Sequence, residues 1–131
     1  MNHQKKQPRI DKLFDVNATK KDFLFHRCFS LNVSTSGLLI ASNKNIELTK
    51  GDLLHLVIDP WEIFFEQSIA CTAFVARVSS SDSIGLEKYK QLIDAPEEVK
   101  KVFGVFIDYM NPSHKKEWEI YIDYLRKSDM V

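Results

Sequence analysis

Apolar and polar residues alternate, or apolar residues form short runs, over much of the first two thirds of the chain. This pattern predicts strands over residues 23–31, 38–41 and 53–58, then a long β-prone stretch over 63–78 with a bend at 67–68. Polar turns containing asparagine, glycine or proline separate these segments. Strands at this spacing, joined by short turns, indicate a mainly β domain built as a small antiparallel barrel or sandwich.

The periodicity changes after the last of these stretches. A serine-rich loop is followed by apolar residues at helical spacing, which predicts a helical insertion over residues 79–101. Residues 102–109 return to a strand pattern. Ser113 is then expected to cap an amphipathic helix over residues 113–127 that closes one end of the barrel. The apolar face of this helix comprises Trp118, Tyr121, Ile122 and Leu125.

Charge is unevenly distributed along the chain. The 131 residues suggest one domain, and the formal net charge of zero argues against a general attraction to nucleic acid. Residues 1–21 nevertheless carry six basic and two acidic side chains, a net charge of +4, and show little periodicity. We therefore expect a basic N-terminal arm over residues 1–21, mobile without a ligand, and a barrel domain over 22–131. A plain disordered tail is the alternative for the first segment.

The remaining chemistry is sparse. Cys28 and Cys71 lie in apolar strand-like runs, where buried free thiols are the expectation. The four histidines have no metal-ligand spacing, and no glycine-rich phosphate loop or nucleophile elbow is present, so we expect no metal site, no cofactor and no enzymatic activity. No signal peptide and no run of 18 apolar residues is found, which favours a cytoplasmic protein of bacterial type without membrane insertion.

The turn between the first two predicted strands has a distinctive composition, Asn32-Val33-Ser34-Thr35-Ser36-Gly37. Asparagine and serine side chains accept hydrogen bonds from nearby backbone, and glycine permits a positive φ or a close approach to the main chain. By itself the segment is an ordinary polar β-turn. The surrounding sequence suggests more than a plain turn, because Arg9 lies 23 positions before Asn32 within a basic stretch.

A basic segment, a polar turn opening a barrel and a C-terminal helix together resemble the PilZ domain family. The binding signature of that family is an Arg-x-x-x-Arg arm followed by Asp/Asn-x-Ser-x-x-Gly. The second half is intact at Asn32, Ser34 and Gly37, whereas the first half has Lys5 in place of the first arginine and retains Arg9. The resemblance extends to three later segments, at residues 47–53, 74–78 and 103–107.

The resemblance implies a PilZ-like β-barrel that binds the bacterial second messenger cyclic di-GMP through an arm that wraps over one barrel face. Carried over residue by residue, it gives the ligand-binding residues Lys5, Arg9, Asn32, Ser34 and Gly37. A guanine presents O6 and N7 to the fork of an arginine, whereas its N1–H and N2–H edge needs acceptors such as Asn32 and Ser34. A lysine at position 5 cannot form the planar fork but can hold a phosphate.

Three functional hypotheses follow. The first is a cyclic di-GMP-binding signalling adaptor that orders its arm on binding and presents a surface to an unidentified protein partner. The second is a degenerate PilZ-like domain without nucleotide binding, acting as a protein-interaction module in motility or pilus function. Its partner surface would lie at Trp61, Phe64 and Phe65 or at residues 79–101. The third, a barrel that binds single-stranded nucleic acid, is disfavoured by the zero net charge and by aromatic residues in core-like positions.

Overall fold

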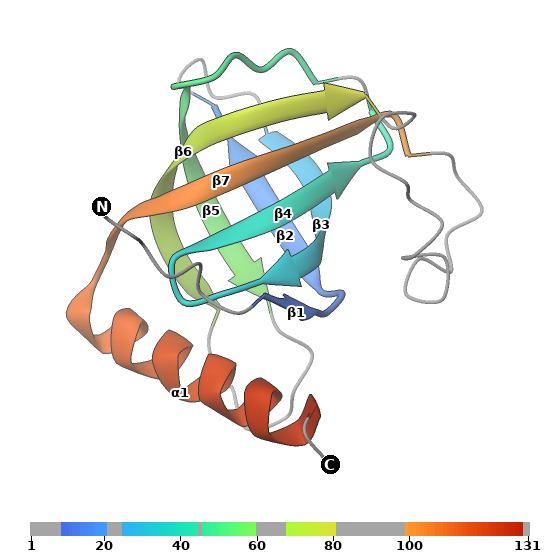
Figure 1. Ribbon diagram of the computed structural model, residues 1–131. Helices are drawn as coiled ribbons and strands as arrows, with labels where there is room; N and C mark the ends of the chain where they lie inside the picture. Colours follow the sequence, from blue (N-terminus) through green and yellow to red (C-terminus); the bar gives the residue numbers. More distant parts are fainter. Residues whose placement is uncertain (1–8, 21–24, 45, 60–67, 81–98, 130–131) are drawn as a thin grey trace, which may run out of the picture.

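The computed structural model describes residues 9–20, 25–44, 46–59, 68–80 and 99–129. They form seven strands and one helix (Figure 1). In chain order these are β1 (Ile10–Asp11), β2 (Asp15–Thr19), β3 (Phe25–Val33), β4 (Gly37–Ser42), β5 (Leu53–Asp59), β6 (Ile69–Ser80), β7 (Lys101–Met110) and α1 (Pro112–Asp129).

The strands form one antiparallel sheet that closes on itself. Its order is β1-β3-β2-β5-β6-β7-β4, and a further pairing of β3 with β4 closes six of the strands into a barrel. The short strand β1 lies beside β3, beyond the end of β2. The expected small antiparallel β-barrel with a C-terminal helix is therefore confirmed.

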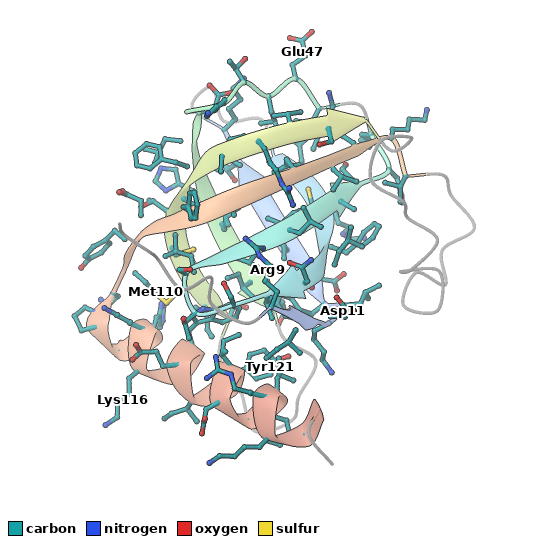
Figure 2. The ribbon with its side chains drawn as sticks, in the orientation of Figure 1. Arg9, Asp11, Glu47, Met110, Lys116 and Tyr121 are labelled. Carbon is teal, nitrogen blue, oxygen red and sulfur yellow. The ribbon has the colours of Figure 1, made fainter. Side chains whose placement is uncertain are left out.

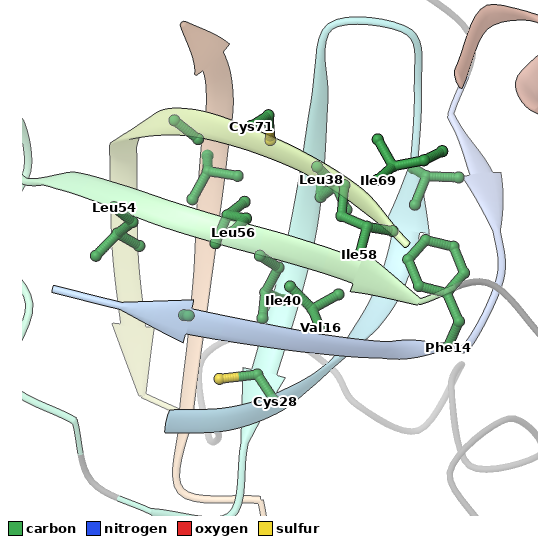
Figure 3. Close-up of a cluster of buried hydrophobic side chains, with 14 of the residues drawn as sticks. Phe14, Val16, Cys28, Leu38, Ile40, Leu54, Leu56, Ile58, Ile69 and Cys71 are labelled. Atoms are coloured by element: carbon green, nitrogen blue, oxygen red, sulfur yellow. The ribbon is translucent and has the colours of Figure 1, made fainter. Parts of the chain in front are cut away.

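Alternation along the strands explains which face of the sheet is inside. In β5, exposed and buried positions alternate strictly, and Leu54, Leu56 and Ile58 point into the barrel. The same two-residue period brings side chains from the other strands into one core, of which Figure 3 shows a part. Strand β4 is buried on both faces, because Leu38 and Ile40 join this core while Leu39 and Ala41 join a second cluster on the opposite face.

The C-terminal helix begins one residue before the predicted position. Pro112 is its first residue, a position where the missing N–H costs nothing. Asn111 rather than Ser113 caps the helix, because its Oδ1 accepts a hydrogen bond of 2.9 Å from the backbone N–H of Ser113. The predicted cap was therefore two residues too late.

The predicted apolar face of the helix is buried, as expected. Trp118, Tyr121, Ile122 and Leu125 are each at most 5% exposed. The Trp118 ring packs edge-on against Phe14, with centroids 6.3 Å apart and an interplanar angle of 89°. The helix thereby lies across the end of the barrel next to β1 (Figure 1).

The expectation of an N-terminal arm over residues 1–21 is wrong for its second half. Strands β1 and β2 lie within that range, and β2 pairs with both β3 and β5. Phe14, Val16 and Ala18 alternate with polar residues and are buried, but the many charged neighbours conceal this short strand in the sequence. The sheet therefore begins at Ile10 and its barrel strands at Asp15, and residues 1–8 lie outside the described part.

One basic side chain of the expected arm also has a structural role. Lys20 Nζ donates to the carbonyl oxygen of Glu47 at 2.9 Å and lies 3.2 Å from Asp52 Oδ2. A hydrogen bond from the backbone N–H of Thr49, together with Lys20, lowers the pKa of the Asp52 carboxyl. Lys20 thus fastens the turn before β5 to the end of β2.

Two further expectations concern residues that the structure does not describe. The first is the proposed partner surface at Trp61, Phe64 and Phe65. The second is the predicted helical insertion at 79–101, of which the central part, residues 81–98, is not described. The two ends of that range are described: β6 continues through Ser80 and β7 begins at Lys101.

Both cysteines are buried free thiols, as the sequence predicts. Burial raises the pKa of each thiol to about 12, and for Cys28 a side-chain hydrogen bond with Ser42 opposes part of this rise. At pH 8 such a thiol is ionised in roughly one molecule in ten thousand. Because the thiolate is the reactive form, we expect both thiols to react with DTNB only slowly in the folded protein.

Absorbance at 412 nm tests this expectation, with the same reaction in guanidinium chloride as the control that releases both thiols. Rapid reaction of one equivalent in the folded protein would mean that one of the two cysteines is accessible.

Candidate functional site

The turn that joins β3 to β4 is stabilised by its own polar groups. The backbone N–H of Ser34 donates to the carbonyl oxygen of Gly37 at 2.9 Å. The Ser34 hydroxyl lies 3.4 Å from both the Gly37 carbonyl oxygen, to which it donates, and the Ser36 backbone nitrogen, from which it accepts. Ser34 is only 2% exposed. Its hydroxyl therefore shapes the turn in this structure.

Gly37 is required for the packing of the barrel. A Cβ atom at this position would collide with the carbonyl oxygen of Val105 in β7. Among the described glycines only Gly51 has a positive φ, so Gly37 meets a steric need for close strand approach and has no special backbone conformation. The close approach expected at this glycine is made by the main chain of the protein itself.

Strand β1 brings Arg9 to the turn. Ile10 pairs with Val33 and Asp11 with Asn32, which places the preceding residue, Arg9, beside the end of β3. The Arg9 guanidinium donates a hydrogen bond of 3.0 Å from Nη1 to Asn32 Oδ1. Figure 2 shows Arg9 on the barrel side near β4 and β1. Asn32 is 6% exposed, whereas Arg9 is exposed. The structure thus joins two predicted site residues that are 23 positions apart.

The five predicted site residues divide into three groups. Arg9 and Asn32 are in direct contact, Ser34 and Gly37 complete the adjoining turn, and Lys5 lies outside the described residues. A guanidinium carries five N–H donors, and the contact with Asn32 uses one of them. The site can therefore offer further donors to an anion or to a carbonyl-rich base edge.

A groove on the other side of the turn is less suited to an anion. It has a volume of about 610 Å³ and lies between the turn, the end of β7 and the first turns of α1. Two lysines and two carboxylates face it, so its charges balance. The lining includes Thr35, Ser36, Asp108, Lys115, Lys116 and Glu119.

Other kinds of site are not found in the part of the chain that the structure describes. Those residues contain no group of three or more histidine, cysteine, aspartate or glutamate side chains arranged to hold a metal ion. No helix formed by them is long and apolar enough to cross a bilayer.

Arg77 is a residue near the site that the sequence does not identify. In the sequence it is only part of a strand pattern, whereas in the structure it is exposed on β6 and strand pairing connects it to Asn32 on β3. Val75 points into the barrel, so uninterrupted alternation would also turn Arg77 inward. A register shift between Val75 and Arg77 places Arg77 on the outer face instead, and the pairing of four strands places it in one row with Asn32.

No family model and no curated protein matches the sequence. Among solved structures, the chain is similar to the Bacillus subtilis inhibitor of motility (MotI/DgrA), with a TM-score of 0.69 and 16% identity over 98% of this chain and 52% of that one. It is also similar to the PilZ domain of YcgR from Escherichia coli with c-di-GMP, with a TM-score of 0.68 and 13% identity over 97% of this chain and 95% of that one. The chain spans about half the length of the Bacillus protein. Identities this low concern the fold alone, and the fold of this chain is PilZ-like.

Proposed function

Starting from this PilZ-like fold, we propose that the protein binds cyclic di-GMP at the outer face of the barrel beside the 32–37 turn. The observation that carries the proposal is the hydrogen bond between Arg9 and Asn32, which holds a basic side chain at the intact half of the signature. One of the similar structures is described as a PilZ domain with c-di-GMP, which supports the choice of ligand.

The chemistry of the ligand fits the donors and acceptors of this site. Arg9 can turn its fork toward guanine O6 and N7, a contact worth roughly 1–3 kcal/mol of discrimination. When Arg9 turns to the ligand, the Asn32 amide oxygen loses this donor and can accept from the N1–H and N2–H edge of a guanine. Lys5 can contribute a cation to a phosphate, although not a fork. Binding therefore exchanges a contact within the protein for contacts with the ligand.

We further propose that binding is transmitted to a protein partner. Arg9 directly precedes β1, and the basic residues of positions 1–8 come before it, so a ligand held by Arg9 would also restrain that segment. An ordered segment over the barrel face would change the surface that a partner meets. The description of one similar structure as an inhibitor of motility supports an adaptor role of this kind.

Isothermal titration of cyclic di-GMP into the full chain tests the proposal, with GTP and cyclic di-AMP as controls for selectivity. Arg9→Ala is expected to weaken binding at least about tenfold, because it removes the guanidinium fork. Arg27→Ala is the matched control, since Arg27 is an exposed arginine on β3 opposite Asn17, away from the turn. Equal affinities for the Arg9→Ala and unaltered proteins would contradict the assignment of Arg9.

A second candidate function is a nucleotide-free interaction module. Three exposed apolar side chains, Leu53, Phe74 and Phe106, are directly paired across β5, β6 and β7, which makes a continuous apolar row on the outer face. A ligand at 100 times its dissociation constant should stabilise the fold by roughly 2.7 kcal/mol. No heat and no thermal shift under that condition would favour the interaction module.

A further inference from the structure

Arg77 and Asn32 lie at the two ends of one row across the outer face of the barrel. Arg77 in β6 pairs with Gly104 in β7, Gly104 pairs with Leu39 in β4, and Leu39 pairs with Asn32 in β3. Directly paired residues of antiparallel strands share a face. Leu39 faces away from the inner core, which contains its neighbours on both sides, so the whole row lies outside.

Arg77 leans along this row toward Asn32. An ideal Cβ atom on Gly104 would lie 3.2 Å from Arg77 Nε and 3.3 Å from its Cγ, so the arginine side chain extends from β6 over the backbone of β7. At the other end, the Arg9 guanidinium lies at Asn32. With strands about 4.8 Å apart, Gly104 and Asn32 are separated by two strand spacings, or about 10 Å, which sets the scale of the interval between the two arginine side chains.

Among the residues that the structure describes, no carboxylate lies in the row between these two arginines. Strands β3, β4 and β6 contain no aspartate or glutamate, and the one carboxylate of β7, Asp108, accepts a hydrogen bond from Thr72 at 3.3 Å. Within the described residues Arg77 has no hydrogen bond or ion pair. Between the arginines the row holds only Gly104, which has no side chain, and the buried Leu39. Asp11 pairs with Asn32 and shares this outer face, but it lies beyond Asn32, outside the interval between the two arginines. The interval itself is therefore lined by two guanidinium groups and no carboxylate of the described strands.

We propose that Arg77 is a further ligand-binding residue, the second guanidinium of a two-arginine site that accepts an anionic nucleotide between Arg9 and Arg77. The inference rests on the proposed function and adds to it the residue that supplies a planar fork where Lys5 cannot. A ligand with two bases and two phosphates can engage both forks at once, whereas a mononucleotide engages them less well.

Titration of cyclic di-GMP into the full-length Arg77→Ala variant tests the inference, with Arg27→Ala again as the matched exposed arginine. We expect Arg77→Ala to raise the Kd at least about tenfold and Arg27→Ala to change it by less than about twofold. Both variants should keep the unfolding midpoint of the unaltered protein, because each arginine is exposed. Equal Kd values for the Arg77→Ala and unaltered proteins would overturn the role of Arg77 and leave the proposed function standing.

Failure of the unaltered protein to bind would overturn the proposed function and this inference with it, so the two failures are distinguishable. Gly104→Ala provides an independent check, because its new Cβ would push the flexible Arg77 side chain aside without meeting backbone. We expect this variant to weaken binding several-fold in the presence of Arg77 and not at all on the Arg77→Ala background. Additive losses in the double variant would overturn the claim that Arg77 binds from its position over Gly104.

Discussion

Replacement of Trp118 by alanine is expected to lower the free energy of unfolding by about 3–5 kcal/mol, the typical cost of removing a large buried aromatic ring. The side chain is 1% exposed and contacts Phe14, and the ring centroid of Tyr121 lies 5.9 Å from its own. Its loss would leave a cavity between the helix and the end of the barrel. Urea denaturation monitored by circular dichroism measures the change.

Ile120→Ala is the matched control for this experiment. Ile120 lies on the same helix but is 56% exposed, so its truncation should change the free energy of unfolding by no more than about 0.5 kcal/mol. Equal losses for the two variants would mean that the helix does not depend on Trp118 for its attachment. The loss in free energy of unfolding for Trp118→Phe is expected to lie between those for Trp118→Ala and Ile120→Ala. Phenylalanine retains an aromatic ring, and the indole N–H that it removes has no hydrogen-bond partner among the described residues.

Gly37→Ala is expected to destabilise the fold by about 1–3 kcal/mol, because a methyl group at this position would collide with the backbone of β7 and force the strands to shift. The obstacle is the carbonyl oxygen of Val105, which cannot rotate away as a side chain can. The shift in the urea midpoint of unfolding measures this effect.

Gly104→Ala is the control for Gly37→Ala, since its new methyl group would meet only the flexible side chain of Arg77. If the two substitutions lower the free energy of unfolding by the same amount, close packing of β4 on β7 would not be the reason for glycine at position 37. The comparison also bears on function. A loss of ligand binding in a Gly37 variant would report first on the barrel, and the Arg9 and Arg77 variants are therefore the better probes of the ligand.

The sequence predicts correctly those elements that are specified by the spacing of apolar residues within a short segment. Two-residue alternation identified the central strands, and helical spacing identified the buried face around Trp118 and Tyr121. Strand β2 was missed because Asp15, Asn17 and Thr19 occupy its outer face and Lys20 follows it, so that polarity outweighs the alternation. The helix cap was misplaced by two residues because asparagine and serine both favour that position.

The site was predictable only as far as the family resemblance reaches. The family resemblance assigned Arg9 and Asn32 to one site. The contact between them depends on the pairing of β1 with β3, which no local sequence pattern specifies. Gly37 was expected to permit a close approach by main chain or by a ligand ring, and in the structure the main chain of β7 makes such an approach. Arg77 could not be assigned from sequence, since its position relative to Asn32 depends on the register of four strands. The role of Lys5 stays a prediction.

Closure of the barrel restricts how a partner protein can bind. Recognition by strand addition needs a free sheet edge whose backbone groups can pair with a new chain. Each of the six barrel strands has a neighbour on both sides, and β1, the remaining strand of the sheet, offers only two residues at its outer edge. Among the described residues, the surfaces left for a partner are therefore side chains on the barrel face and on α1, where single substitutions of exposed residues can separate partner binding from folding.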